Sequence, residues 1–230
     1  MLDLGDSSDI DVICHLVSPK GRVFVDVGCG KGELSRDLAK HGAHVHGLDP
    51  DSVQLARNRL SQSPRVNFHD ARAESISLPD QSADVVIFCR SLHHVDLSAM
   101  PMAIQQAFRL LRRPNGMLIV IEPDINGSWS QLLRPFHDET EVRKSALRAL
   151  DEFAKPIFGE FEEHLYRNTI EFRSFEDFLM NQTNVTFRAT DRGCVDNPVV
   201  RALFEAAGND GKYTFHQPLF VRLYRDPISM

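Results

Sequence analysis

The sequence predicts an α/β fold built on a doubly wound, mostly parallel sheet. In the first half, short runs rich in β-branched residues alternate with amphipathic segments of helical length. Strands that alternate with helices in this way run parallel and are joined by right-handed crossovers. A glycine-rich turn directly after the first strand is typical of the ligand-binding edge of such a sheet.

Seven strands are expected. The apolar run Val23–Val27 suits a strand that is buried on both faces, and four similar runs follow it before Pro123. Two further apolar runs lie in the second half. The expected strands are 23–27, 43–48, 66–68, 84–89, 117–121, 185–189 and 219–224.

Helices are expected between these strands. Leu34 and Leu38 share one helical face, and Gly42 is a typical C-terminal stop. In the next helix we expect Val53, Ala56 and Leu60 to face inward. The expected helices are one carrying Ile10, Ile13, Cys14 and Val17 with Ser7 or Ser8 as its cap, then 33–41, 51–60, 101–111, 175–180 and 197–208. The stretch from Asp124 to about Arg173 reads as mostly helix.

Composition narrows the function classes. The chain has 230 residues, 42% of them hydrophobic, and a formal net charge of −6 with no run of Lys or Arg. Nucleic acid and anionic membranes are therefore not expected as partners. We see no signal peptide and no membrane-spanning run, and the four cysteines form no CxxC pair. These features favour a cytoplasmic protein without a zinc site.

A glycine-rich loop links the first strand to the first helix of the alternating pattern. Gly28, Gly30 and Gly32 have GxGxG spacing, and Asp26 precedes them by two residues. A dinucleotide fingerprint has GxGxxG, and a pyrophosphate disfavours an adjacent carboxylate. An acid beside the loop instead suits a positively charged sulfonium amino acid. A plain strand–turn–helix is the alternative interpretation of the loop alone.

A second acid, Asp49, ends the second expected strand. In a doubly wound sheet this position lies beside the glycine loop, where a carboxylate accepts both hydroxyls of a ribose. The alternative is an N-cap for the following helix, which Asp also fills well. We assign Asp49 to the ribose and Asp51 to the helix start.

Five ordered stretches then resemble one family. VFVDVGCGKGELSRDL, GAHVHGLDPDSV, ARAESISLPDQSADVVIF, SLHHV and FRLLRRPNGMLIVIEP are similar to class I S-adenosylmethionine-dependent methyltransferases of the ubiquinone/menaquinone methyltransferase-like superfamily. The resemblance covers residues 23–123 and implies a Rossmann-like fold. It implies these cofactor-binding residues: Asp26, Gly28, Cys29, Gly30, Gly32, Asp49, Pro50, Arg72, Ala73, Glu74, Cys89 and Arg90.

The sequence departs from the family at the expected adenine contact. The family often has Asp before the Ala-Glu pair, where this chain has Arg72. Asp70 supplies that acid if the loop is shifted. The sequence leaves open which of the two residues occupies the position.

His93 and His94 are the candidate catalytic residues. They follow the fourth expected strand, and a neutral imidazole can act as a general base. The alternative is a structural loop with one histidine capping and one packing. His41, His44 and His46 lack a further ligand at matching spacing, so no metal site is expected.

A cap over the acceptor is expected after the fifth strand. We predict one domain over residues 1–230, with a cofactor-binding core at 1–123, a helical cap at about 124–170 and a segment at about 171–230 that completes the sheet. Trp129, Arg134, His137, Tyr166 and Arg167 are the candidate acceptor residues. Packing of these side chains within the cap itself is the alternative.

The sequence thus predicts in-line methyl transfer from S-adenosylmethionine to a small-molecule acceptor, with S-adenosylhomocysteine as product. The alternatives are a cofactor-binding protein with little or no methyl transfer, or a methyltransferase acting on RNA or protein. Glycine spacing disfavours a nicotinamide dehydrogenase. We expect a monomer or homodimer.

Overall fold

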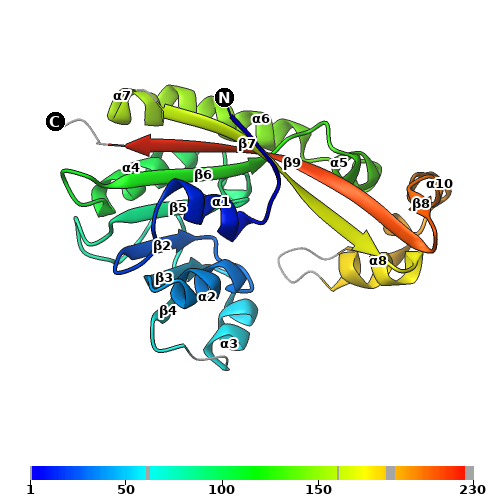
Figure 1. Cartoon of the computed structure of the whole chain (residues 1–230), viewed down its shortest axis with the longest axis horizontal. Helices are drawn as coiled ribbons and strands as arrows, with labels where there is room; N and C mark the ends of the chain where they lie inside the picture. The colour runs from blue at the N-terminus through cyan, green and yellow to red at the C-terminus, as the bar shows by residue number, and fades with distance from the viewer. Residues whose placement is uncertain (1, 61–62, 160, 185–189, 226–230) are drawn as a thin grey trace.

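The computed structural model describes residues 2–60, 63–159, 161–184 and 190–225. Its described strands form one sheet (Figure 1). In spatial order they are β1 (Leu2–Asp6), β7 (Phe161–Phe172), β9 (Lys212–Arg225), β6 (Met117–Pro123), β5 (Val85–Cys89), β2 (Val23–Val27), β3 (His44–Asp49) and β4 (Val66–Asp70), with β8 (Gly208–Asn209) paired to β9.

The predicted fold class is confirmed. Strands β4, β3, β2, β5 and β6 pair in parallel, and β9 then pairs antiparallel with β6 and with β7. The sheet has nine strands where seven were expected. Six of the expected strands are present, and β1, β7 and the short β8 were not predicted as strands. The strand expected at 185–189 lies outside the described residues.

The expectation of mostly helix from Asp124 to about Arg173 is wrong for its last part, because Phe161–Phe172 form strand β7. β7 pairs with β9 over its whole length, from Phe161 opposite Tyr224 to Phe172 opposite Tyr213. The scattered aromatic residues of the segment resembled a helical pattern, but pairing with a strand some fifty residues later decides its structure. Strand propensity depends on such tertiary partners, which are not adjacent in sequence.

The helices confirm most of the expected ones. They are α1 (Asp9–Leu16), α2 (Glu33–Lys40), α3 (Ser52–Leu60), the 3₁₀ turn η1 (Leu92–His94), α4 (Met100–Leu110), α5 (Ser128–Leu133), α6 (Thr140–Ala149), the π-turn η2 (Leu150–Ala154), α7 (Lys155–Phe158), α8 (Phe175–Thr183), α9 (Arg192–Val195) and α10 (Pro198–Glu205). The Ser8 hydroxyl caps α1 by accepting from the Asp11 N–H at 3.3 Å.

The inward face predicted for α3 is wrong. Val53 and Leu60 are 49% and 86% exposed, whereas Gln54, Leu55 and Asn58 are buried. The Asn58 amide donates to the Gly30 carbonyl at 2.7 Å. The inner face of α3 is thus partly polar because it holds the glycine loop.

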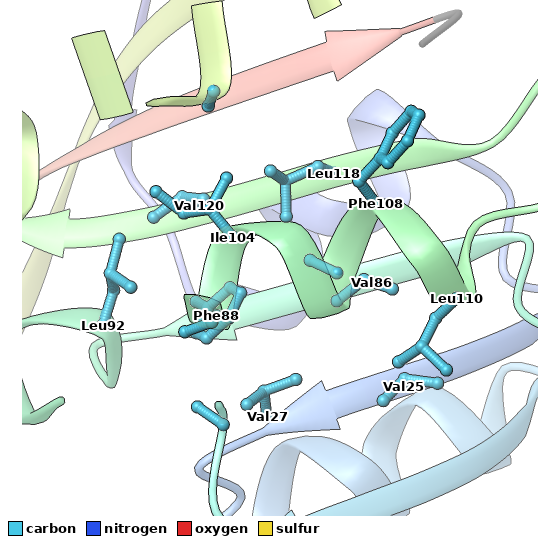
Figure 2. Packing of buried hydrophobic residues seen from close by; sticks show 14 of the residues in the cluster. Val25, Val27, Val86, Phe88, Leu92, Ile104, Phe108, Leu110, Leu118 and Val120 are labelled. Atoms are coloured by element: carbon cyan, nitrogen blue, oxygen red, sulfur yellow. The ribbon is translucent and has the colours of Figure 1, made fainter. Parts of the chain in front are cut away.

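Two apolar layers enclose the sheet. On one face, residues from α1 and α2 pack against alternate strand residues such as Phe24 and Ile119. On the other face, Ile104 and Phe108 of α4 belong to one apolar cluster with residues of β5 and β6, and Figure 2 shows Phe108 near Leu118 and Ile104 near Val120. Burial on both faces explains why the central strands are apolar throughout.

A third apolar cluster lies apart from these layers. Beyond their pairing with β1 and β6, strands β7 and β9 continue as a two-stranded arm made of 168–172 and 213–217 (Figure 1). The arm carries α5, α8, α9 and α10, whose apolar residues form a separate core that includes Phe178, Phe204 and Phe215. We call these elements together the arm lobe.

Candidate functional site

A cavity of about 1000 Å³ lies at the carboxyl ends of the parallel strands. Its walls come from the loops that follow β2, β3, β4 and β5, and from one helix of the arm lobe, α8. Open α/β sheets bind ligands at this edge. Of the predicted cofactor residues, all except Gly32 line the cavity.

The glycine loop needs glycine for two reasons. Gly28, Gly30 and Gly32 all have positive φ angles, which L-residues with side chains rarely adopt. A Cβ on Gly28 would lie 2.5 Å from the Cβ of Ser91, and a Cβ on Gly32 would lie 2.7 Å from the Phe68 ring. Gly32 itself is the N-cap of α2, so it shapes the loop from outside the cavity.

Asp26 is a buried carboxylate at the end of β2. It is 1% exposed and accepts a hydrogen bond from the Ser35 hydroxyl at 2.6 Å. Burial raises the pKa of Asp26 to about 6, with the Ser35 hydrogen bond acting in the opposite direction. A buried acid of this kind is an electrostatic site for a cationic group.

Asp49, which was predicted to bind a ribose, holds the glycine loop through its carboxylate. Its Oδ2 accepts from the Gly30 N–H at 2.7 Å, and its Oδ1 accepts from the Asp51 N–H at 2.8 Å. Each carboxylate oxygen can accept a second hydrogen bond, so hydroxyls of a ligand can still be bound. The prediction for Asp51 is confirmed, because its carboxylate accepts from the Val53 and Gln54 N–H groups at the start of α3.

The loop after β4 settles which residue faces the cavity. Ala71, Arg72, Ala73 and Glu74 line it, whereas Asp70 is an exposed strand residue paired with Asp49. The shifted arrangement in which Asp70 supplies the acid is not observed.

Arg90 lies in the cavity wall with a strained backbone. Its φ angle is +55°, and its guanidinium pairs with the Asp9 carboxylate and donates to Asn168 at 3.2 Å. Such strain persists where surrounding contacts impose it, and it is concentrated at functional sites. Cys89 beside it has a pKa raised well above its ordinary value by burial. The Cys89 thiol is therefore an unreactive neutral group.

The two adjacent histidines have different surroundings. His94 lines the cavity, and desolvation together with the neighbouring His93 lowers its pKa to about 4. His93 is 4% exposed and does not line the cavity. Its Nδ1 pairs with the buried carboxylate of Glu122 on β6. His94 is thus a neutral imidazole open to a ligand, and His93 anchors the η1 turn.

A cluster that the sequence spacing did not show surrounds His93. Possible ligand atoms of His93, His94 and Glu139 lie within 4.8 Å of one another. Glu139 already pairs with Arg143 and His137, each at 2.6 Å. These neighbouring groups would repel a metal cation or compete with it, so the geometry is that of a buried ionic network joining η1 to α6.

The structure does not bring the predicted acceptor residues to the cavity. Trp129 stacks on Phe172 with ring centroids 5.8 Å apart, inside the arm lobe. Tyr166 is 1% exposed and donates to Asp9 at 2.6 Å. The other three bond elsewhere: Arg134 to the Ile125 carbonyl, His137 to Glu139 and Arg167 to Asp6.

Helices α5, α6 and α7 follow β6, where the helical cap was expected, but they do not line the cavity. None of the described residues that line the cavity comes from 124–170. The wall comes instead from Asp177, Met180, Asn181 and Asn184, on and just after α8. The sequence predicted helix α8 but not its place in the cavity wall. The arm that holds α8 opposite the loops forms only when β7 pairs with β9, and these strands are far apart in the sequence.

The site can bind a ligand that carries hydroxyl groups and a positively charged group. Carboxylates accept hydrogen bonds from hydroxyl and ammonium groups, and Asp26 and Asp49 present them on either side of the glycine loop. The imidazole of His94 also lines the cavity. At the upper end of the usual volume range for ligand pockets, the cavity has room for a second ligand beside the first.

The segment that carries the cavity loops after β2, β3, β4 and β5 is similar to known proteins. Residues 24–116 match the family model described as a methyltransferase domain. The ubiquinone biosynthesis O-methyltransferase of Paraburkholderia xenovorans is 34% identical over 111 residues, which cover 46% of this chain and 45% of that protein. A Mycolicibacterium smegmatis protein named as a probable S-adenosylmethionine-dependent methyltransferase is 31% identical over 58% of this chain and 51% of its own length. The chain spans about half the length of these curated relatives.

Solved structures share the fold over nearly the whole chain. A structure from Bacillus halodurans C-125 has a TM-score of 0.64 at 19% identity and covers 96% of this chain and 100% of that one. The [4+2]-cyclase SpnF has a TM-score of 0.62 at 21% identity, with 96% and 81% covered. At these identities the likeness shows the fold alone. Among the described residues, no helix is both long and apolar enough to cross a bilayer.

Proposed function

We propose that this chain, whose residues 24–116 form a class I methyltransferase domain, transfers a methyl group from S-adenosylmethionine to a small-molecule acceptor. The observation that carries the proposal is the placement of Asp26 and Asp49 on either side of a glycine loop at the strand ends. S-adenosylhomocysteine is the product that leaves the cavity.

The residues present fit this cofactor. Asp26 and the loop would hold its amino acid part, Asp49 its ribose hydroxyls, and the segment 71–74 its adenine. Ser91 packs so closely against Gly28 that a Cβ there would lie 2.5 Å from the Ser91 Cβ, so the loop can keep this shape only with glycine. When bound, the cofactor supplies an electrophilic methyl group on a sulfonium whose departure leaves a neutral thioether.

The protein then contributes to the reaction mainly by positioning the cofactor and the acceptor. Holding two reactants in line can contribute roughly 7–11 kcal/mol to a reaction of this kind. We propose His94 as the group that takes a proton from the acceptor where the acceptor carries one, since its imidazole lines the cavity. His93 acts as a positioning residue through its contact with Glu122.

Three further features belong to the proposal. A small acceptor, rather than RNA, agrees with the net charge of −6. A reducing compartment such as the cytoplasm agrees with four free cysteines. A single functional unit of 230 residues, as monomer or homodimer, is proposed for the chain.

Calorimetry on the full chain tests the cofactor. We expect S-adenosylmethionine and S-adenosylhomocysteine to bind and NAD to bind far more weakly. Asp49→Ala should weaken binding about 100-fold, because hydrogen bonds to a charged group are lost and the loop loses its anchor. Asp37→Ala is the control, since Asp37 pairs with Lys40 on α2 and does not line the cavity.

Transfer from methyl-labelled cofactor to a metabolite library tests the reaction. Methylation of small molecules supports the proposal. Cofactor binding with no transfer to any acceptor would favour the binding-protein alternative, and tighter binding of NAD than of S-adenosylmethionine would overturn the cofactor assignment.

A further inference from the structure

Helix α8 has two faces that serve different parts of the molecule. Phe175, Phe178, Leu179 and Gln182 are buried, three of them in the core of the arm lobe. The cavity is lined by Asp177, Met180, Asn181 and Asn184. Both sets follow the i, i+3, i+4, i+7 spacing of a single helical face. The lobe core therefore fixes the rotation of α8 and turns a mostly polar face toward the cavity.

This face differs from the opposite wall of the cavity. The loops of the opposite wall carry the residues proposed for the cofactor, so α8 is the side left for the acceptor. Met180 is 45% exposed and offers an apolar contact, while Asn181 and Asn184 offer amide groups. The carboxylate of Asp177 has no hydrogen-bond or ion-pair partner within the described part of the chain.

The charge around the cavity is strongly negative. Seven carboxylates and three cationic side chains line it. Two of the cations have carboxylate neighbours: Arg90 pairs with Asp9, and Arg72 lies 3.9 Å from Glu74. The third, Lys31, belongs to the glycine loop on the cofactor side. Asp96, on the loop after β5, is a second lining carboxylate without a partner among the described residues.

We propose that the α8 face formed by Asp177, Met180 and Asn181 is the acceptor-binding wall, and that the acceptor is a small molecule carrying a cationic amine. This inference rests on the proposed methyl transfer and names the class of its acceptor. The ammonium group pairs with Asp177, the carbon skeleton contacts Met180, and the carboxylate of Asp96 adds to the attraction. The amine is the group that holds the acceptor, and the atom that takes the methyl group is a separate one.

The same arrangement disfavours carboxylate acceptors. A carboxylate in this cavity would be desolvated beside Asp177 and Asp96, and like charges brought together in this way oppose binding. Selectivity therefore comes from repulsion of acids as well as attraction of amines.

The first experiment compares matched phenols with the full chain and labelled cofactor. Tyramine, tyrosol and 3-(4-hydroxyphenyl)propionate share a phenol ring and differ in an amine, a hydroxyl or a carboxylate on the side chain. A metabolite library sorted into amines, neutral compounds and carboxylates extends the comparison. We expect methylation to be concentrated in the amines. Methylation of no amine, or of carboxylates at least as well as amines, overturns the inference.

The second experiment uses a matched pair of neighbouring acids. For the best amine acceptor, Asp177→Asn should raise KM about tenfold, because a charge-assisted contact is lost. Asp177→Glu should restore part of it. Glu176→Gln should leave KM unchanged, since Glu176 pairs with Arg192 at the surface and does not line the cavity. Equal KM values for Asp177→Asn and the parent overturn the role of Asp177.

Calorimetry with S-adenosylhomocysteine separates the two proposals. Asp177→Asn should bind it as the parent does. A parent chain that binds no S-adenosylhomocysteine contradicts the proposed function, whereas normal cofactor binding with a preference for acidic acceptors contradicts only the inference about the amine.

Discussion

The two walls of the cavity are held in place by different means. The loops that carry Asp26 and Asp49 follow strands in the middle of the sheet, and hydrogen bonds such as Gly30 N–H to Asp49 fix them locally. Helix α8 lies opposite them on an arm, and the aromatic core of the lobe fixes its orientation. One wall is thus part of the central fold, and the other belongs to a lobe with a core of its own.

This difference agrees with separate roles for the two walls, with the cofactor held by the sheet and the acceptor held by the lobe. A wall inside the sheet keeps its geometry as long as the domain is folded. Such a wall suits a cofactor, which stays the same whichever acceptor is bound. A lobe joined to the rest of the molecule through β7, β9 and the chain segments on either side of α5 can open as a local unit with its own stability. The comparison predicts that the lobe can be weakened while the cofactor wall stays intact.

Removing a ring from the lobe core should have the largest effect. Phe178 is 0% exposed and contacts the rings of Trp129, Phe136 and Phe204, among others. Phe178→Ala should destabilise the lobe by about 3–5 kcal/mol. Hydrogen exchange should show loss of protection in α8 and α10, and acceptor turnover should fall, while S-adenosylhomocysteine still binds.

A matched change in the sheet should behave differently. Phe24 of β2 is also 0% exposed. Phe24→Ala should lower protection across the whole sheet and weaken S-adenosylhomocysteine binding as well. If both variants lose cofactor binding equally, the two walls are one cooperative unit and the comparison fails.

Substitutions at two glycines test the cofactor wall, with a smaller expected change in stability. Gly28 and Gly21 both have φ of +76°, but only a Cβ at Gly28 meets another atom within 4 Å. Both Ala variants bear the backbone strain, and Gly28→Ala adds a clash with Ser91 worth about 1–3 kcal/mol. Urea unfolding should show this difference, and only Gly28→Ala should weaken cofactor binding. Equal stability of the two variants would contradict the close approach of Ser91.

The smallest effect is expected from pH. Asp26 has a raised pKa of about 6, so its carboxylate form is present above that pH and is lost below it. Affinity for S-adenosylhomocysteine, whose ammonium pairs with the carboxylate, should rise about tenfold between pH 5 and pH 7 and then level off. Calorimetry across this range should show no such rise for Asp26→Asn. A slope that persists in this variant would assign the titration to another group.

Local patterns in the sequence predicted the cofactor wall well. The spacing of Gly28, Gly30 and Gly32 marks a turn with positive φ angles, and Asp49 ends a strand that must lie beside that turn. Contacts of the glycine loop such as Gly30 with Asp49 and with Asn58 join segments that follow one another closely along the chain. The choice between Asp70 and Arg72 needed the structure, because a shift of two residues in a loop leaves no periodic signal.

The sequence could not predict the second wall. The aromatic residues after Pro123 indicated helices. No local feature of the segment that forms β7 indicates that it pairs with β9. Tyr166 and Trp129 looked like lining residues because they are large and aromatic. Tyr166 is instead buried against Asp9, and the half-buried Trp129 stacks on Phe172 in the lobe. Glu139 likewise joined His93 only through the packing of α6 against η1.

By itself, the sequence determined the alternating strand and helix order, the parallel centre of the sheet and the loop with its two acids, because hydrophobic periodicity and turn chemistry act over a few residues. Only the tertiary structure decided that α8 rather than residues 124–170 faces the cavity, and that His94 rather than His93 is open to it. Those outcomes depend on the pairing between β7 and β9 and on the side-chain contact between His93 and Glu122, which join residues far apart in the chain.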